Sequence, residues 1–357
     1  MIYYHIIING KDIENEKKKN YEFTKDPKEL KFQSDITTTN TFYGWNDMFE
    51  IFISYQDNKE YLVSPNSNNY NLDIFSLNDH KKIKSIKGHN NKIRTVRYFM
   101  NNKNKNEYLI SAGDDKNVII WDINDDYNIK RIIDTKYEKH ILSCLLIFPE
   151  NVDDIYIITS SYNTSDNYEN SATKIYSLND GNFIKYINNT NDIPIYYLLS
   201  WYNRNEHKNY IIQFCKNKIL INNLFEDELN FELIKEPESF HFSGFIYNKD
   251  KKDYLCSSSS NGYINIWDLY NKKLFKVINT NGCELTHIIE WNKKYFIVAN
   301  RKKKSFKIIN VENNSIIDIK SNHTDELISI KKVVHPIYGE SLLSAGRDRK
   351  IKLWIIE

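Results

Sequence analysis

Short apolar runs alternate with polar segments along most of the chain. Typical runs are Tyr-Leu-Ile-Ser at 108–111, Tyr-Ile-Ile-Thr at 156–159, Tyr-Leu-Cys-Ser at 254–257 and Tyr-Phe-Ile-Val at 295–298. Because they are short and rich in β-branched and aromatic residues, they predict strands and not helices. The segments between them contain the Asn, Asp, Gly and Ser that favour tight turns. The pattern therefore predicts an all-β chain of short strands.

The strand pattern repeats. Residues 110–122 read ISAGDDKNVIIWD, and residues 343–354 read LSAGRDRKIKLW. When this pattern is moved along the chain, the Trp position falls at Phe75, Trp121, Tyr176, Asn222, Trp267, Ile309 and Trp354. The spacings are 46, 55, 46, 45, 42 and 45 residues, close to the roughly 40 to 45 residues of a four-stranded propeller blade. The repeat therefore predicts seven blades.

Three of the seven units resemble the WD40 repeat. The second unit has Gly88-His89, Ser111, Asp115 and Trp121-Asp122. The seventh has His323, Ser344, Asp348 and Trp354, with Asn322 replacing the Gly and Ile355 the final Asp. The fifth keeps Ser257 and Trp267-Asp268, with Asn261 in the position of the turn Asp. The resemblance covers about residues 40 to 357 in spacing, and it implies a seven-bladed WD40-type β-propeller.

The signature residues have a physical role that does not depend on the family. Blades in a ring bury both faces, so their polar groups must satisfy one another. A His before the blade can donate to the Ser on the second strand and to the Asp in the next turn, while the Trp N–H donates to the Ser hydroxyl. We therefore expect a structural tetrad at each complete signature.

A hydrolase triad is the alternative interpretation of the same residue types. Ser111 follows Tyr-Leu-Ile in a strand expected to be buried, and it lacks the exposed G-x-S-x-G turn of a nucleophile. The set also recurs at matching spacing, 22 and 21 residues from His to Ser and 10 from Ser to Trp. With no Gly-rich phosphate loop and no HExxH motif, we expect no catalytic residue and no enzyme.

Ring closure requires a strand from the other end of the chain. The sequence ends three residues after Trp354, which leaves the seventh unit with three strands. An unpaired strand edge promotes aggregation, so we expect a strand within Glu29 to Thr38 to complete that blade. Residues 29–357 would then form one propeller domain. Residues 1–28 would be an extension of unknown role, pairing either with a partner or with the propeller's own edge.

Composition limits the remaining chemistry. A net charge of +2 argues against a dominant nucleic-acid or membrane field. The four cysteines, Cys144, Cys215, Cys256 and Cys283, show no CxxC spacing, so we expect reduced thiols and neither metal nor cofactor. Residues 1–8 are too short to span a membrane and lack a basic flank. We expect an intracellular protein, cytoplasmic or nuclear.

The resemblance also implies where partners bind. WD40 partners often contact the face that carries the His loops and the turns between second and third strands. The matching positions, expected to be exposed, are Lys92, Arg94 and Asp114 in blade two, Ser260 in blade five, and Glu326, Ile328 and Arg347 in blade seven. An insertion at Ser161 to Ser171 should be an exposed turn of blade three.

Two turns on that face are basic. One is Arg301, Lys302, Lys303 and Lys304, and the other contains Arg347, Arg349 and Lys350. Seven cations on adjacent blades would attract phosphate or carboxylate groups. The alternative is lysine accumulated in solvated turns through an AT-rich codon bias. The sequence therefore predicts a protein-binding scaffold, with an anion-binding propeller for phosphopeptide, phosphoinositide or RNA as the competing hypothesis.

Overall fold

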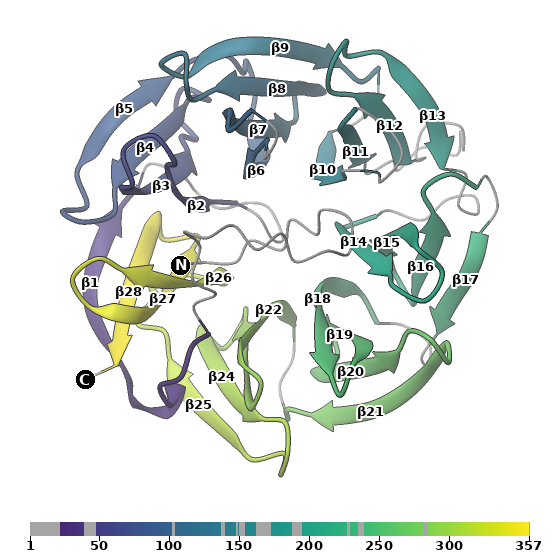
Figure 1. Cartoon of the computed structure of the whole chain (residues 1–357). Coiled ribbons are helices and arrows are strands. Elements are labelled where there is room, and N and C mark those ends of the chain that lie inside the picture. The colour runs from purple at the N-terminus through teal and green to yellow at the C-terminus, as the bar shows by residue number, and fades with distance from the viewer. Residues whose placement is uncertain are drawn as a thin grey trace.

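The computed structural model describes residues 22–38, 48–101, 104–136, 140–147, 149, 154–161, 173–187, 195–226, 229–234, 239–281 and 284–356. Seven four-stranded antiparallel sheets are arranged in a ring, each forming one blade (Figure 1). The predicted all-β, seven-bladed propeller is confirmed. No helix among the described residues is both long and apolar enough to cross a membrane.

The blades follow one another along the chain. Blade one contains β2 (Glu50–Ile53), β3 (Glu60–Pro65), β4 (Leu72–Ser76) and β5 (Lys82–Ile86), and blade two contains β6 (Ile93–Met100), β7 (Glu107–Gly113), β8 (Asn117–Asp122) and β9 (Asn128–Asp134). Blade three contains β10 (Ile141–Ile147), β11 (Tyr156–Ser161), β12 (Thr173–Ser177) and β13 (Phe183–Ile187), and blade four contains β14 (Tyr197–Asn203), β15 (Lys208–Phe214), β16 (Lys218–Asn223) and β17 (Leu229–Ile234). Blade five contains β18 (His241–Lys249), β19 (Lys252–Ser259), β20 (Tyr263–Asp268) and β21 (Lys273–Asn279), and blade six contains β22 (Leu285–Asn292), β23 (Tyr295–Asn300), β24 (Ser305–Asn310) and β25 (Ile316–Lys320). Blade seven contains β26 (Leu327–His335), β27 (Gly339–Gly346), β28 (Lys350–Ile356) and β1 (Leu30–Thr37).

The repeat register holds in every blade, whether or not the signature is present. The residue at the Trp position lies on the third strand and pairs with an apolar residue of the second. The pairs are Phe75 with Leu62, Trp121 with Leu109, Tyr176 with Ile157, Asn222 with Ile211, Trp267 with Leu255, Ile309 with Phe296, and Trp354 with Leu342. The apolar pattern of the strands is therefore enough to specify a blade, and the WD40 signature residues are not required for it.

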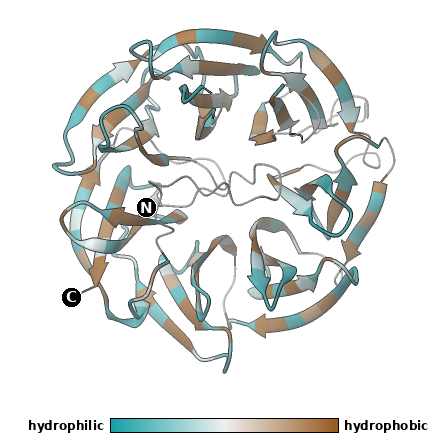
Figure 2. Cartoon of the chain, viewed as in Figure 1, coloured by the Kyte–Doolittle hydropathy of each residue, from teal (hydrophilic) through white to brown (hydrophobic). Residues whose placement is uncertain are grey.

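The hydrophobic core lies between blades. Seven clusters of buried residues are found among the described residues, and each spans one interface between neighbouring blades. In the interface of blades one and two, for example, Phe52 and Val63 pack with Leu109 and Trp121. Strand β7 is buried throughout, whereas β9 at the rim buries only Ile133. Apolar and polar positions accordingly alternate along the outer strands (Figure 2).

The N-terminal strand β1 is the outermost strand of blade seven. It pairs antiparallel with β28 from Leu30 opposite Ile356 to Thr37 opposite Lys350 (Figure 1). The segment in which we expected the closing strand, Glu29 to Thr38, contains this strand. Because β1 pairs with β28, the edge of β28 is not left unpaired. This agrees with the expectation that an open strand edge would promote aggregation.

Other expectations fall partly outside the described residues. Residues 1–21 of the N-terminal extension are outside them, while residues 22–28 lie against blades six and seven. The insertion expected at Ser161 to Ser171 connects β11 to β12, and residues 162–172 are outside the described part. Cys144, Cys215 and Cys256 are buried free thiols, and burial raises the pKa of Cys215 to about 12.

Candidate interaction surface

The tetrad of blade two is a continuous chain of hydrogen bonds. Trp121 Nε1 donates to Ser111 Oγ at 2.8 Å, and Ser111 Oγ lies 2.7 Å from His89 Nε2. His89 Nδ1 lies 2.8 Å from an oxygen of Asp115. Gly113 ends strand β7 beside this loop because a Cβ there would stand 2.1 Å from the Lys92 carbonyl oxygen. Loop, strand and turn are thus held together at one end of the blade.

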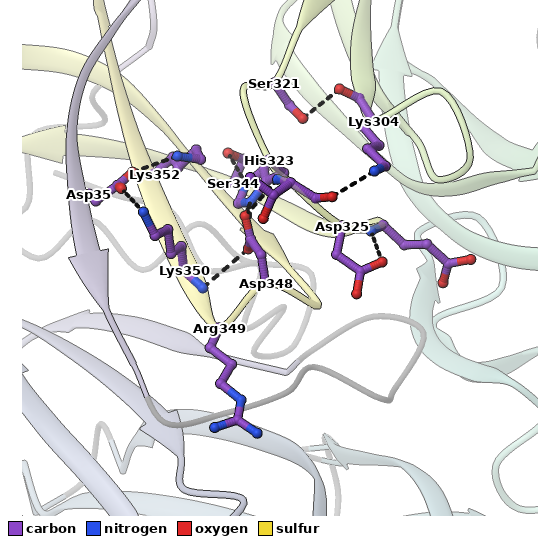
Figure 3. Close-up of polar contacts among 12 residues, drawn as sticks. Asp35, Lys304, Ser321, His323, Asp325, Ser344, Asp348, Arg349, Lys350 and Lys352 are labelled. Atoms are coloured by element: carbon purple, nitrogen blue, oxygen red, sulfur yellow. Dashed lines mark hydrogen bonds and ion pairs between the residues drawn. The ribbon is translucent and has the colours of Figure 1, made fainter.

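Blade seven has the same arrangement. Trp354 Nε1 donates to Ser344 Oγ at 2.9 Å, and Ser344 Oγ lies 3.0 Å from His323 Nε2. His323 Nδ1 lies 2.9 Å from Asp348 (Figure 3). A Cβ on Gly346 would stand 2.6 Å from that same ring nitrogen, so this glycine makes room for the imidazole, whereas Gly113 of blade two makes room for the Lys92 backbone.

The direction of these bonds depends on which ring nitrogen of His89 carries the proton. A neutral imidazole has one donor and one acceptor nitrogen. With the proton on Nδ1, that N–H donates to the carboxylate of Asp115 and Nε2 of His89 accepts from the Ser111 hydroxyl, which itself accepts from the indole. Burial alone would raise the pKa of Asp115, but the bonds from His89, Asn90 and Asn117 outweigh it and lower that pKa. Every polar group of the tetrad is satisfied within it.

Blade five keeps only part of the network. Trp267 Nε1 donates to Ser257 Oγ at 3.1 Å. Asn261, in the position of the turn Asp, instead accepts from the hydroxyl of Ser259 at 2.6 Å. The blade retains its four strands and register, so the remaining bonds of the tetrad are not needed to form it.

The candidate partner residues of blade two include an ion pair. Arg94 and Asp114 form a two-point bond, with Nε and one Nη of the guanidinium donating to the two carboxylate oxygens at 2.6 and 2.9 Å. Both side chains and that of Lys92 are half-buried. Ser260 of blade five is also half-buried, and its carbonyl accepts from the Glu284 N–H. These residues line the face, but Arg94, Asp114 and Ser260 already form hydrogen bonds within the propeller.

The expectation that Ile328 is exposed is wrong. Ile328 is fully buried in the cluster that contains Met48 and Phe49, at the interface of blades seven and one. Its strand register corresponds to that of Arg94, because Leu327 pairs with Gly346 as Ile93 pairs with Gly113. At this position the arginine reaches a turn carboxylate. An isoleucine has no such partner and packs inward instead.

The seven cations of the two turns do not form an uncompensated basic patch. Glu326 accepts from both Arg301 and Arg347, at 2.7 and 2.6 Å, which places the turns of blades six and seven together. Glu284 lies 3.8 Å from Arg301 and 2.5 Å from Lys302. The expected field is therefore reduced by acids in the loops before β22 and β26.

The other cations of these turns have different environments. Lys350 lies 2.5 Å from Asp35 of β1, and Lys304 donates to the Thr324 carbonyl. Lys303 and Arg349 are exposed, and Arg349 extends away from the tetrad in Figure 3. What remains at the surface of the two turns is a mixture of both charges with a small excess of lysine and arginine.

Sequence reasoning missed one recurrent acid. Glu107, Asp253 and Glu340 each stand four residues before the Ser of their unit, and all three are buried. Glu107 accepts from the Ser54 hydroxyl and the Tyr55 N–H of blade one, at 3.0 and 2.8 Å. Each of these acids binds a segment from outside its own blade. Their shared spacing from the Ser was the signal that could have revealed them.

Comparison with known proteins agrees with the geometry. The family model described as WD domain, G-beta repeat matches residues 80–122, which cover the first three strands of blade two and its His loop. A search of curated proteins finds no match. Among the described residues, no group of three or more metal-ligating side chains is close enough to hold an ion. With seven four-stranded blades in one register and two complete tetrads, the chain is a WD40-repeat β-propeller.

Proposed function

We propose that this propeller is a non-catalytic scaffold that binds a protein or peptide partner, within a larger intracellular complex, through the face carrying the His loops. WD40 propellers generally mediate protein–protein interaction. The observation that carries the proposal is that the side chains of the tetrad form hydrogen bonds with one another. His89, Ser111 and Asp115 bond one another in a buried site, so the Ser111 hydroxyl is not exposed as a nucleophile. Binding through the surrounding turns is what the face offers.

The charge pattern of the face favours a partner with both charges. Arg94 with Asp114, and Arg347 with Glu326, place a cation beside an anion in blades two and seven. Half-buried pairs of this kind fix orientation and select complementary partners more than they add affinity. A polyanion such as RNA would meet the carboxylates of Asp114 and Glu326 beside these two arginines. The same pairs therefore weigh against the phosphopeptide, phosphoinositide or RNA hypothesis.

The test is affinity purification of the tagged chain, followed by mass spectrometry, with one designed variant. The exchange Arg94→Asp with Asp114→Arg keeps an ion pair in blade two but reverses its direction on the face. We expect the folded variant to lose at least one partner that the wild type captures. Replacing Lys17, Lys18 and Lys19 by Glu, in the N-terminal extension, is the matched control for a general charge effect.

Two results would decide against the proposal. Identical partners for wild type and variant would exclude this face as the binding surface. Capture of nucleic acid or phosphoinositide vesicles, lost as salt rises, would support the competing anion-binding function, because exposed charges are screened beyond about 10 Å at 0.1 M salt. We also propose residues 29–357 as one domain. Limited proteolysis tests this, because cleavage should be confined to the segment before residue 29 and to the exposed turn expected at Ser161 to Ser171.

A further inference from the structure

A segment without regular secondary structure, Glu22 to Asp26, lies between blades six and seven. It sits at the end of these blades where the β22–β23 and β26–β27 turns lie, opposite the end that carries His323 and the β27–β28 turn. In Figure 1 it is the purple stretch that precedes β1. We name the space that it occupies, bordered by Trp291, Tyr295, Lys332 and Glu340, the strap slot.

One aromatic side chain anchors the segment. Phe23 is buried, and its ring meets Trp291 edge-on with 4.6 Å between centroids. The Lys332 ammonium lies 5.1 Å from the Phe23 ring centroid, a cation–π distance. The neighbouring residues Glu22, Thr24, Lys25 and Asp26 are exposed. A single buried side chain therefore provides most of the apolar contact.

The backbone of the segment is recognised on both its donor and acceptor sides. Glu340 accepts from the Thr24 N–H at 2.9 Å with one carboxylate oxygen, and from the Lys25 N–H at 2.8 Å with the other. Trp291 Nε1 donates to the Lys25 carbonyl at 3.0 Å. The Tyr295 hydroxyl donates to the Asp26 carboxylate at 3.1 Å. Two successive N–H groups on one carboxylate form a strong, charge-assisted contact.

At two other interfaces the equivalent acid has different partners. Between blades four and five, Trp201 Nε1 donates directly to Asp253 at 3.1 Å, the acid in the position of Glu340. Between blades one and two, Glu107 binds the turn of blade one itself. Of these three acids, compared within the described part of the chain, Glu340 alone binds a segment from outside the ring, and the Trp291 indole binds the same segment.

We propose that the strap slot is a peptide-recognition site whose resident ligand is the chain's own residues 22–26, and that it also takes a partner segment of the same chemistry. That chemistry is an aromatic residue, then two residues with free backbone N–H groups, then an acidic residue. The slot contacts Lys25 through its backbone N–H and carbonyl, so that side chain can vary. Thr24 donates to Glu340 with its N–H and, at 3.0 Å, with its hydroxyl, so a hydroxyl residue is favoured at that position. Neither residue can be proline. This site is separate from the His-loop face, so either proposal can fail without the other.

A tethered segment competes strongly because its effective concentration is of the order of millimolar. The test therefore weakens the resident segment in the full chain with Phe23→Ala and Thr24→Pro, which remove the anchor and one N–H donor. The probe is a fluorescent synthetic peptide with the sequence of residues 22–29, EFTKDPKE, followed by anisotropy. We expect the weakened chain to bind it at least about tenfold more tightly than the wild type, a difference of about 1.4 kcal/mol.

Two further substitutions in the weakened chain identify the site. Glu340→Gln should reduce peptide affinity by about tenfold or more, since a carboxylate accepting two N–H groups is lost. Glu107→Gln is the matched control at the equivalent position and should leave peptide binding unchanged. A probe with Ala in place of Phe should not bind to any of these chains.

The proposal is overturned if the weakened chain keeps its circular dichroism spectrum and melting temperature but binds no peptide. Equal losses from Glu340→Gln and Glu107→Gln would also overturn it. The milder Phe23→Ala variant keeps both N–H donors, in case the double variant does not fold. If neither variant folds, the segment is an obligatory part of the propeller and not an exchangeable ligand.

Discussion

Blade two and blade seven have the same tetrad but different chain connectivity. The tetrad distances agree within 0.3 Å, at 2.8, 2.7 and 2.8 Å in blade two and 2.9, 3.0 and 2.9 Å in blade seven. The strands of blade two run without interruption from Ile93 to Asp134, whereas blade seven takes its outer strand from Leu30–Thr37. The tetrad therefore depends on the first three strands alone.

The outer strand of blade seven is held by side chains where blade two has a hairpin. Asp35 of β1 lies 2.5 Å from Lys350 and 2.6 Å from Lys352 of β28 (Figure 3). Blade six contains the same contact between consecutive strands, Lys307 with Asp318 at 2.6 Å. Lys331 of blade seven also donates to Glu50 of blade one across the closing interface, at 2.9 Å. Ion pairs therefore connect β1 to β28, two strands that are not joined by a hairpin.

The largest effect should come from removing the closing strand. Deletion of residues 1–40 removes β1 and exposes the β28 edge, so we expect no soluble expression. Deletion of residues 1–20 leaves β1 and the strap slot segment and should express normally. Expression trials and thermal unfolding of both chains test this. An unchanged melting temperature after the longer deletion would contradict closure by β1.

Tetrad substitutions should come next, with equal effects in the two blades. Ser111→Ala or Asp115→Ala leaves a buried donor without its acceptor, which costs roughly 1 to 3 kcal/mol. Ser344→Ala and Asp348→Ala should cost a similar amount if connectivity does not matter to the tetrad. Urea unfolding of the four variants measures this. A variant with wild-type stability that lost a specific activity would instead point to catalysis.

Asp35→Asn should have a smaller effect, confined to blade seven. Burial alone would raise the pKa of Asp35, but its bonds to Lys350 and Lys352 outweigh it and lower that pKa. A lowered folded-state pKa means stability that is present above about pH 4 and lost as the pH falls through the folded value. We expect a loss of about 1 kcal/mol at pH 7, after discounting for solvent screening, and little difference from wild type near pH 2.

The smallest effect on folding should come from the exposed part of the basic turns. Lys302→Glu with Lys303→Glu and Arg349→Glu changes exposed side chains, so stability should change by no more than about 0.5 kcal/mol. If these cations contribute to recognition, partner binding should weaken, and less so at high salt. Lys17→Glu, Lys18→Glu and Lys19→Glu together provide the control, and equal behaviour of both triples would mean that the turns carry no recognition.

Period, blade number and the origin of the closing strand could be predicted because they depend on local strand pattern and on counting. Asn222 and Ile309 occupy the Trp position without resembling Trp, yet their strands read as apolar runs at the correct spacing. The ion pairs of the basic turns could not be predicted from the local strand pattern. Pairing of Arg301 and Arg347 through Glu326 depends on the distance between loops of two blades, which the sequence does not encode locally.

The burial of Ile328 and the strap slot have the same explanation. Ile328 has the sequence position of Arg94, which is half-buried and paired with Asp114. The surroundings of Ile328 instead come from Met48 and Phe49 at the other end of the chain. Phe23 lies in a polar, charged stretch with no strand pattern, and its partners Trp291 and Lys332 are more than 260 residues away. Contacts between distant segments decide both sites.

Amide hydrogen exchange on the intact chain tests the comparison most directly. Peptides covering β1 (Leu30–Thr37) report the closing strand, and peptides covering β9 (Asn128–Asp134) report the outer strand of blade two. Closure by β1 predicts that the two strands are protected to within about tenfold, a difference in opening free energy of about 1.4 kcal/mol. Exchange of β1 at the rate of an unfolded chain, with β9 still protected, would contradict it.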